Sequence, residues 1–183
     1  MSIKPGSLLI AQPFMLDPNF KRAVLCICEH EEEEGTVGFV LNKKIKGKIT
    51  DIVEDFPEFD AAVFLGGPVG TDSLHYMHNV GDLLEGSQKI MPGLFWGGDF
   101  EKLKFLIKQE LIHTSNIRFF IGYSGWSSGQ LSTELESGSW IRSKMHPNYA
   151  FKTKHFNLWN EALNNKGRNF KVIAQMPDST QLN

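Results

Sequence analysis

Short apolar runs along the chain predict a series of β-strands. Residues 23–28, AVLCIC, are continuously apolar, which is typical of a strand covered on both faces. Residues 36–41 form the returning strand of a hairpin, whose tip carries four glutamates at 31–34. Four adjacent carboxylates do not tolerate burial, so this tip is expected to be solvated. Other runs predict strands over residues 7–11, 61–65, 73–78, 119–121 and 171–174.

Apolar side chains spaced by three and four residues predict two longer helices. The first begins after Asp99, which suits an N-cap. Its apolar stripe contains Phe100, Leu103, Ile107 and Leu111. The second covers about residues 155–166 and ends at Gly167. Its apolar side contains Phe156, Trp159 and Leu163.

The order of these elements indicates the fold class. Hairpins are mixed with crossovers, so we expect an α+β protein: a single domain with a mixed β-sheet, hairpins and flanking helices. The domain is expected to cover residues 1–183, with a polar and mobile tail from about residue 176. A chain of 183 residues is long enough to bury one hydrophobic core.

Composition and charge narrow the partners and the compartment. The net charge is −2 and the pI is about 6.3, so the chain as a whole does not attract nucleic acid or anionic membranes. The apolar runs are too short for a membrane span or a signal peptide. We expect a cytoplasmic protein with no membrane partner and no direct contact with nucleic acid. The basic residues 43–48 are interpreted as a surface loop, and DNA binding through them remains an alternative.

The stretch of residues 118–137, RFFIGYSGWSSGQLSTELES, is interpreted as the functional centre. An apolar strand leads into a turn with three glycines, and a helical pattern begins at Gln130. Glycines permit unusual backbone conformations, and a helix start presents free N–H groups. Trp126 lies within this turn, where we expect a ligand or partner to contact it.

Residues 125–129, GWSSG, match the pattern G-x-S-x-G between a strand and a helix, which is the context of a nucleophile elbow. On this interpretation Ser127 is the nucleophile of a hydrolase. A triad also needs an acid and a histidine, and His146 and His155 stand in segments without a recognisable catalytic context. A glycine turn that happens to contain serines is the favoured alternative.

Cys26, Cys28 and His30 follow one another at a spacing of two residues. On an extended strand they share a face, and zinc accepts these ligand types. Residues i and i+2 lie ~6.6 Å apart along a strand, however, so two thiolates reach one zinc only with local distortion. We favour reduced, buried thiols, and we expect no metal and no other cofactor.

A second glycine-rich loop, residues 66–70 (GGPVG), directly follows the strand predicted over 61–65. Its backbone N–H groups could cradle an anion, although it lacks the lysine and hydroxyl of a P-loop. A tight exit from the strand is the simpler interpretation. Glu134 shares a helix face with Gln130, and if it is buried, its carboxylate must be paired or protonated.

Many of these positions form an ordered set along the chain. It contains Leu9-Ile10-Ala11, Pro13, Asp17, Phe20, Arg22, Cys28-Glu29-His30, Gly38, Val40-Leu41-Asn42, Gly66-Gly67-Pro68-Val69, His78, Gly122-Tyr123, Gly125-Trp126, Gly129-Gln130-Leu131, Glu134 and Trp140. In this order and spacing the set resembles the YqgE/AlgH family of small, largely uncharacterised bacterial proteins. The resemblance implies a cytoplasmic α+β domain and, from the name of one branch, a role in transcriptional regulation. It also weakens the hydrolase and metal hypotheses, because the family tends to lack a serine at Ser127 and its pattern excludes Cys26.

Two hypotheses for the function follow. The first is a binding or regulatory module, in which the turn at Trp126 contacts an unknown protein or small molecule. The second is an enzyme or small-anion-binding protein, with His30 or His78 and Glu134 as acid-base groups beside an anion held by Gly66-Gly67. We lean toward no enzymatic activity and assign no catalytic residue. The surface expected to carry the function consists of Glu29, His30, Asn42, Gly66, Gly67, Pro68, His78, Tyr123, Trp126, Gln130 and Glu134.

Overall fold

The computed structural model describes residues 2–167, 170, 172, 174 and 175, and ten strands among them form the sheet. The strands are β1 (Ser7–Ala11), β2 (Val24–Glu31), β3 (Gly35–Val40), β4 (Lys44–Lys48), β5 (Ala62–Leu65), β6 (Val69–His78), β7 (Gln88–Met91), β8 (Leu94–Trp96), β9 (Ile117–Trp126) and β10 (Trp140–Lys144). The helices are α1 (Ile49–Ile52), α2 (Phe100–Lys108), α3 (Gln130–Glu136), α4 (Pro147–Phe151), α5 (Leu158–Asn164) and the 3-10 helix η1 (His155–Asn157).

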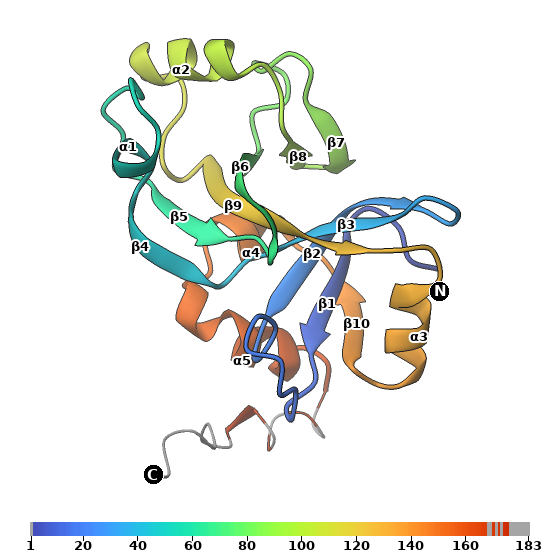
Figure 1. Cartoon of the computed structure of the whole chain (residues 1–183). Coiled ribbons are helices and arrows are strands. Elements are labelled where there is room, and N and C mark those ends of the chain that lie inside the picture. The colour runs from blue at the N-terminus through green and yellow to red at the C-terminus, as the bar shows by residue number, and fades with distance from the viewer. Residues whose placement is uncertain (1, 168–169, 171, 173, 176–183) are drawn as a thin grey trace.

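Strand β9 lies in the middle of the sheet and contacts three other strands. The main order is β10-β1-β2-β3-β9-β6-β8-β7, with β5 beside β9 and β4 beside β5. Strand β9 pairs antiparallel with β3 and β6 and parallel with β5. Figure 1 shows β9 crossing the molecule from the side of α2 to the side of α3. The sheet is therefore mixed, and the predicted α+β fold class is confirmed.

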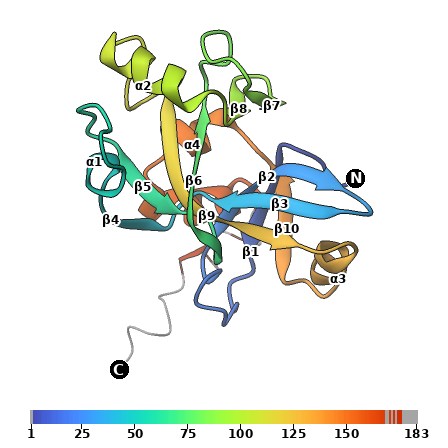
Figure 2. The same cartoon turned by 45° about the horizontal axis from the view of Figure 1, so that its top comes forward.

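The continuously apolar strands are buried on both faces, as predicted for residues 23–28. Val24, Cys26 and Cys28 face one core cluster, which continues into α4 and α5. Leu25 and Ile27 face another, which continues into α3 and β10. A third cluster lies between α2 and the strands β5, β6 and β9. Figure 2 shows α2 and α3 over separate parts of the sheet, so each helix covers its own core.

Helix α2 begins where the sequence predicts. The Asp99 carboxylate accepts a hydrogen bond from the Lys102 backbone N–H at 2.6 Å, and Leu103 and Ile107 are buried. The helix ends at Lys108, however, so the prediction for Leu111 is wrong, and this side chain is 53% exposed. No helix in the described part of the chain has the length and apolar character needed to cross a membrane.

The C-terminal predictions are partly wrong. The helix expected over residues 155–166 is divided into η1 and α5. Trp159 is buried as expected, but Phe156 is 66% exposed because it belongs to η1. In the strand predicted over residues 171–174, the described Val172 and Ala174 are helical, and the other two residues lie outside the described part. The tail expected from residue 176 also lies outside the described residues.

The basic segment is a strand rather than the predicted surface loop. Residues 44–48 form β4, which pairs antiparallel with β5 through Lys44 with Phe64 and Lys48 with Ala62. The lysines of β4 are exposed, whereas Ile45 packs on the core beside α2. This is the alternation that a half-buried strand requires. The sequence of this segment alone suggests a polar loop, and its pairing with β5 makes it a strand.

The prediction of a glycine turn within residues 122–126 is also wrong. Strand β9 continues through these residues, and β3 pairs with it up to Thr36 opposite Trp126. Gly122 has a φ of +66°, and the register of the facing strand β6 shifts between Val69 and Leu74 at this place. The connection between β9 and α3 is therefore only residues 127–129.

Gly66→Ala is expected to destabilise the fold by about 1–3 kcal/mol, because it overpacks a strand junction. The added Cβ would collide with the Gly122 carbonyl oxygen and would lie 2.8 Å from the Phe39 ring. Gly125→Ala is the matched control, since its nearest neighbour is the Tyr123 ring at 3.4 Å. Urea denaturation measures both variants, and an equal loss of stability in the two would contradict the packing argument.

Candidate functional site

The carboxylate of Glu134 is the centre of a hydrogen-bond network beneath α3. Its Oε2 accepts hydrogen bonds from two indole N–H groups, Trp126 Nε1 at 2.9 Å and Trp140 Nε1 at 2.8 Å. Its Oε1 accepts a third from Gln130 Nε2 at 3.0 Å. A half-buried carboxylate with three donors is well satisfied. The network ties α3 to the end of β9 and the start of β10.

Trp126 is buried, which corrects the expectation that a partner contacts it directly. The side chain is 5% exposed, and Trp140 is 4% exposed. The ring of Phe20 stacks near Trp126 with centroids 6.5 Å apart and meets Trp140 edge-on at 5.4 Å. Both indole rings are thus enclosed by aromatic contacts and held by Glu134. Trp126 therefore packs beneath α3 and holds the helix in place through Glu134, and it does not form part of the exposed surface.

The short turn of residues 127–129 is fixed by side-chain hydrogen bonds. Gln130 Oε1 accepts from the Ser127 backbone N–H at 3.1 Å and from the Ser127 hydroxyl at 3.3 Å. Ser128 donates its hydroxyl to the Glu32 carbonyl at 2.7 Å, which links the turn to the acidic hairpin tip. No described histidine contacts the Ser127 hydroxyl, so the geometry of a nucleophile elbow is not formed here.

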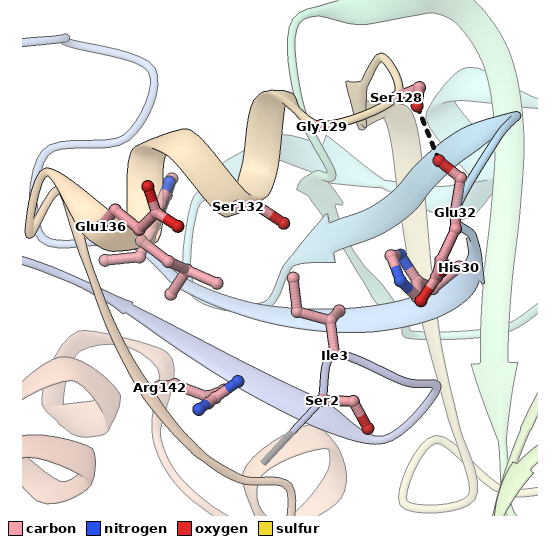
Figure 3. A pocket seen from close by; sticks show the side chains of 11 residues that line it. Ser2, Ile3, His30, Glu32, Ser128, Gly129, Ser132, Glu136 and Arg142 are labelled. Carbon is pink, nitrogen blue, oxygen red and sulfur yellow. Dashed lines mark hydrogen bonds between the residues drawn. The ribbon is translucent and has the colours of Figure 1, made fainter.

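A pocket of about 720 Å³ lies between α3, the end of β2 and the N-terminal segment, and we call it the α3 pocket. Its lining residues are Ser2, Ile3, His30, Glu32, Ser128, Gly129, Ser132, Leu135, Glu136, Trp140 and Arg142. Figure 3 shows Ser132 pointing from α3 into the pocket toward Ile3. His30 and Glu32 lie at one end, and Glu136 and Arg142 lie at the other. The pocket therefore offers groups of both charges and several hydroxyls.

His30 is held at the edge of this pocket by β3. Its Nδ1 lies 2.7 Å from the Thr36 hydroxyl, and Thr36 pairs with Trp126 on β9. The expected site residues His30, Gln130 and Glu134 therefore lie in the same region of the protein, around α3 and the end of β9. Glu29 precedes His30 on β2 and is half-buried.

His78 lies at the opposite end of β9. It pairs with Ile117, nine residues before Trp126, which corresponds to a separation of about 30 Å along the strand. The imidazole is fully buried, with Nε2 2.8 Å from the Gly97 carbonyl, and burial lowers its pKa. His78 is thus a core residue that does not join the groups around α3.

The loop at Gly66–Pro68 lies against the middle of β9. Gly66 donates its N–H to the Ile121 carbonyl at 2.9 Å, so this N–H is not directed at an anion. A Cβ at Gly67 would collide with the backbone of Tyr123, so Gly67 permits a close backbone approach. The interpretation as a tight strand exit agrees with these contacts. The acid-base groups of the enzymatic hypothesis do not surround this loop.

Asn42 lies in a different place again, between the loop after β1 and the start of β4. Its Oδ1 accepts from the Val24 N–H at 2.9 Å, and its Nδ2 donates to the Arg22 carbonyl at 2.8 Å. The expected surface is thus distributed over several regions, and of its members the residues around α3 adjoin the α3 pocket.

The cysteines are buried free thiols in the described structure. A bulge in β2 at Cys28 interrupts the pairing with β3, and burial raises the pKa of the Cys28 thiol. His30 instead contacts Thr36. Within the described residues, no three histidine, cysteine or acidic side chains are arranged to hold a metal ion.

Sequence reasoning missed most of the residues that line the α3 pocket. Ser132 and Glu136 are spaced i, i+4, so a helical projection beside Gln130 and Glu134 would have placed them on a second exposed face. Nothing in the sequence around Arg142 or Ile3 indicates that these residues line a pocket. They reach the pocket only because β10 pairs with β1 and the N-terminal segment runs beside them.

Comparisons with known proteins agree with this fold. A family model described as AlgH-like matches residues 8–171. A UPF0301 protein from Chlorobaculum tepidum is 42% identical over 181 residues, covering 99% of this chain and 96% of the relative. One from Cytophaga hutchinsonii is 38% identical over 179 residues, covering 97% and 98% of the two chains.

Two solved structures share the fold. The AlgH protein of Pseudomonas aeruginosa has a TM-score of 0.75 at 24% identity, covering 97% of this chain and 99% of that chain. A protein of Corynebacterium diphtheriae has a TM-score of 0.77 at 21% identity, covering 96% and 94%. At these identities the likeness shows a common fold.

Glu134→Ala is expected to lower the free energy of unfolding by about 2–4 kcal/mol, because two buried indole N–H groups lose their acceptor. Glu134→Gln keeps one carbonyl acceptor and should lose less. Glu136→Ala, on an exposed position of the same helix, is the control and should stay within about 0.5 kcal/mol of the parent. Urea denaturation followed by tryptophan fluorescence measures all three. Equal stability of the Glu134 and Glu136 variants would refute the structural role of the network.

Stability is expected to fall as the pH decreases from 7.5 to 5.5. Burial lowers the pKa of His75, His78 and His155 in the folded chain. The unfolded chain therefore binds protons first, near pH ~6.5, and protonation favours unfolding below that pH. Urea midpoints measured across this range test the sign. A midpoint that is constant or rises toward pH 5.5 would show that these three histidines do not govern stability in this pH range.

Proposed function

The chain belongs to the AlgH-like family, and for this protein we propose a binding function: the α3 pocket takes a small polar molecule or a polar segment of a protein partner. The volume of about 720 Å³ beside α3 is the observation that carries the proposal. Small-molecule sites commonly have volumes of ~300–1,000 Å³.

The hydrogen bonds that hold α3 in place make it a rigid wall of the pocket, which favours a binding function. Glu134 fixes Trp126 and Trp140, and Gln130 fixes the turn before the helix. A wall that is ordered before the ligand arrives reduces the conformational entropy lost on binding. The Glu134 network therefore gives the pocket a constant shape, and Trp140 is the member of the network that lines the pocket.

The lining groups indicate the chemistry of the ligand. Arg142 offers a cation, Glu32 and Glu136 offer carboxylates, and Ser128 and Ser132 add hydroxyls. A ligand with both a positive and a negative group is complementary to this arrangement. This applies equally to a zwitterionic small molecule and to a mixed-charge peptide segment.

The geometry gives less support to the enzymatic alternative. The acid-base pair of this alternative, His30 or His78 with Glu134, must lie within reach of one substrate. The Glu134 carboxylate is occupied by two indoles, and His78 lies at the other end of β9. The α3 pocket contains His30, whose Nδ1 already contacts the Thr36 hydroxyl.

The proposal includes a regulatory role in the cytoplasm. Reduced thiols at Cys26 and Cys28 suit that compartment. Any link to transcriptional regulation would run through the ligand or partner of the α3 pocket, since a chain of net charge −2 has no overall attraction for DNA.

Ser132→Arg is expected to block the pocket. Ser132 points into the pocket, so an arginine there fills space that the ligand needs. The measurement is a thermal-shift screen of the parent protein against amino acids, short mixed-charge peptides and other zwitterions. A ligand at one hundred times its dissociation constant adds ~2.7 kcal/mol, which corresponds to a midpoint rise of roughly 5–11 °C.

Thr133→Arg is the matched control, because Thr133 is the adjacent exposed residue of α3 and does not line the pocket. Hits should persist in Thr133→Arg and disappear in Ser132→Arg. Hits that survive in both variants would place binding elsewhere and overturn the proposal for this pocket.

A further inference from the structure

The two terminal strands of the sheet, β10 and β7, line one groove. Strand β10 is at one end of the strand order and β7 is at the other. The groove has a volume of about 1220 Å³ and is also lined by the segment before β1 and the end of α5, and we call it the edge groove. It shares Ser2 and Arg142 with the α3 pocket, and its other lining residues are its own. The inference from this groove does not rest on the function proposed above.

Strand β10 has an open edge. Within the described part of the chain, it pairs with β1 alone. In an antiparallel pair, alternate residues direct both of their backbone groups at the partner strand. The Ser139 carbonyl and the Met145 N–H form hydrogen bonds to residues that flank β1, so the odd-numbered positions face β1. Trp140, Arg142 and Lys144 therefore direct their backbone groups at the open edge.

One side-chain contact agrees with this orientation of the backbone. The Arg142 carbonyl accepts a hydrogen bond at 2.7 Å from the ammonium of Lys166, a residue that follows α5 and does not belong to β1. The backbone N–H groups of Arg142 and Lys144 form no hydrogen bond to any described residue. Unpaired backbone groups along a strand edge are a template for an added strand.

The charged side chains of the edge groove are of one sign. Lys4, Lys89, Arg142, Lys144 and Lys166 line it, and none of the described acidic residues does. Among the residues that the structure describes, no aspartate or glutamate forms an ion pair with any of these five cations. In a chain of net charge −2, this concentration of positive charge favours an anionic partner.

Apolar side chains complete the lining of the edge groove. Pro5, Ile90, Met91, Pro92 and Met145 contribute to it, and Ile90 and Met145 are buried. Methionine side chains are flexible and adapt to different neighbours. A peptide strand presents successive side chains to opposite sides. A strand in which acidic and apolar residues alternate is therefore complementary to a groove with cationic and apolar lining.

We propose that the edge groove binds an extended acidic segment of a partner protein, which adds a strand to β10. The backbone of Arg142 and Lys144 holds the main chain of the segment, and the cations of the groove hold its carboxylates. The volume of about 1220 Å³ exceeds the ~300–1,000 Å³ that is common for small-molecule sites, which favours a chain segment. A second copy of this chain is a poorer occupant, because pairing β10 with β10 brings like charges together.

Fluorescence anisotropy of the full chain with labelled octapeptides tests the proposal. The acidic probe alternates glutamate and valine, and the charge control alternates lysine and valine. Two further peptides keep the sequence of the acidic probe but carry N-methyl groups at its odd or at its even positions. The acidic probe should bind and the lysine peptide should not. Methylation in at least one of the two registers should weaken binding by ~10-fold or more, because several N–H donors are lost.

A pair of charge reversals tests the cations. Lys89→Glu combined with Lys144→Glu should weaken binding of the acidic probe by ~5-fold or more, because repulsion replaces attraction at two positions. Lys46→Glu combined with Lys102→Glu makes the same change in net charge at exposed positions outside the groove. This control should bind the acidic probe more tightly than the groove variant does.

A comparison at one position tests the backbone contact. Lys144→Gln and Lys144→Pro both remove the charge, and only proline also removes the N–H at the open edge. Proline is tolerated on an edge strand where its N–H would face away from the sheet. Lys144→Pro should therefore fold and should bind the acidic probe a further ~2–12-fold more weakly than Lys144→Gln. Circular dichroism checks the fold, and if Lys144→Pro is unfolded, the N-methylated peptides decide the same point.

Several results would overturn the proposal. They are absence of saturable binding of the acidic probe, equal affinity of this probe and both N-methylated peptides, equal effects of the two charge-reversal pairs, and equal affinity of the folded Lys144→Pro and Lys144→Gln variants.

Two further measurements separate the edge groove from other sites and partners. Ser132→Arg, which blocks the α3 pocket, should leave binding of the acidic probe unchanged, and a loss of binding there would place the peptide in the α3 pocket instead. A single-stranded oligonucleotide serves as the alternative polyanion. If it binds with a steep loss of affinity in salt and the acidic probe does not bind, the cations serve a nucleic acid and the peptide assignment is wrong.

Discussion

The backbone of Gly66 is the junction on which the sheet depends. Its N–H donates to Ile121 of β9, and its carbonyl accepts from the Val40 N–H and from the buried Ser124 hydroxyl. One peptide segment thus joins the end of β5 to both β3 and β9. The space around it is filled by backbone and by the Phe39 ring, so a side chain has no room. Close packing at this point allows β9 to pair with strands on both sides.

The position of α3 follows from the course of β9. Because β9 extends through Trp126, the indole enters the core beside β3, and α3 begins only four residues later, at Gln130. Glu134 then reaches two indoles that lie 14 residues apart in sequence but 6.1 Å apart between ring centroids. The carboxylate supplies the acceptor that two buried indole donors require. The aromatic residues hold the wall of the α3 pocket in place. The hydroxyl and charged groups of α3 that line the pocket are the ones available to contact a ligand.

The mixed charge of the α3 pocket has a structural reason. The α3 pocket receives carboxylates from the hairpin tip and from α3, and it receives one cation from β10. Elsewhere, two side chains hold the loop after β1 to the segment before β4: Asn42 Nδ2 donates to the Arg22 carbonyl, and Lys43 Nζ donates to the Lys21 carbonyl. Nearby, burial against Phe64 lowers the pKa of Arg118 to about 10 while its guanidinium donates to the Leu41 carbonyl at 2.7 Å.

The sequence by itself determined the elements whose signals are local. The doubly buried strand at residues 23–28, its hairpin with a solvated acidic tip, and the Asp99 cap of α2 all depend on periodicity or on neighbours within a few residues. The family resemblance was also contained in the sequence. Tertiary structure alone decided the rest. Residues 44–48 became a strand because β5 lies beside them, and the apparent turn at Gly122 became strand because β3 and β6 pair across it. The pairing of β9 with β3 and β6 also buried Trp126 and separated His78 from His30, whereas the pairing of β10 with β1 brought Arg142 to the α3 pocket. Such outcomes depend on contacts between residues distant in sequence, and local spacing does not encode them.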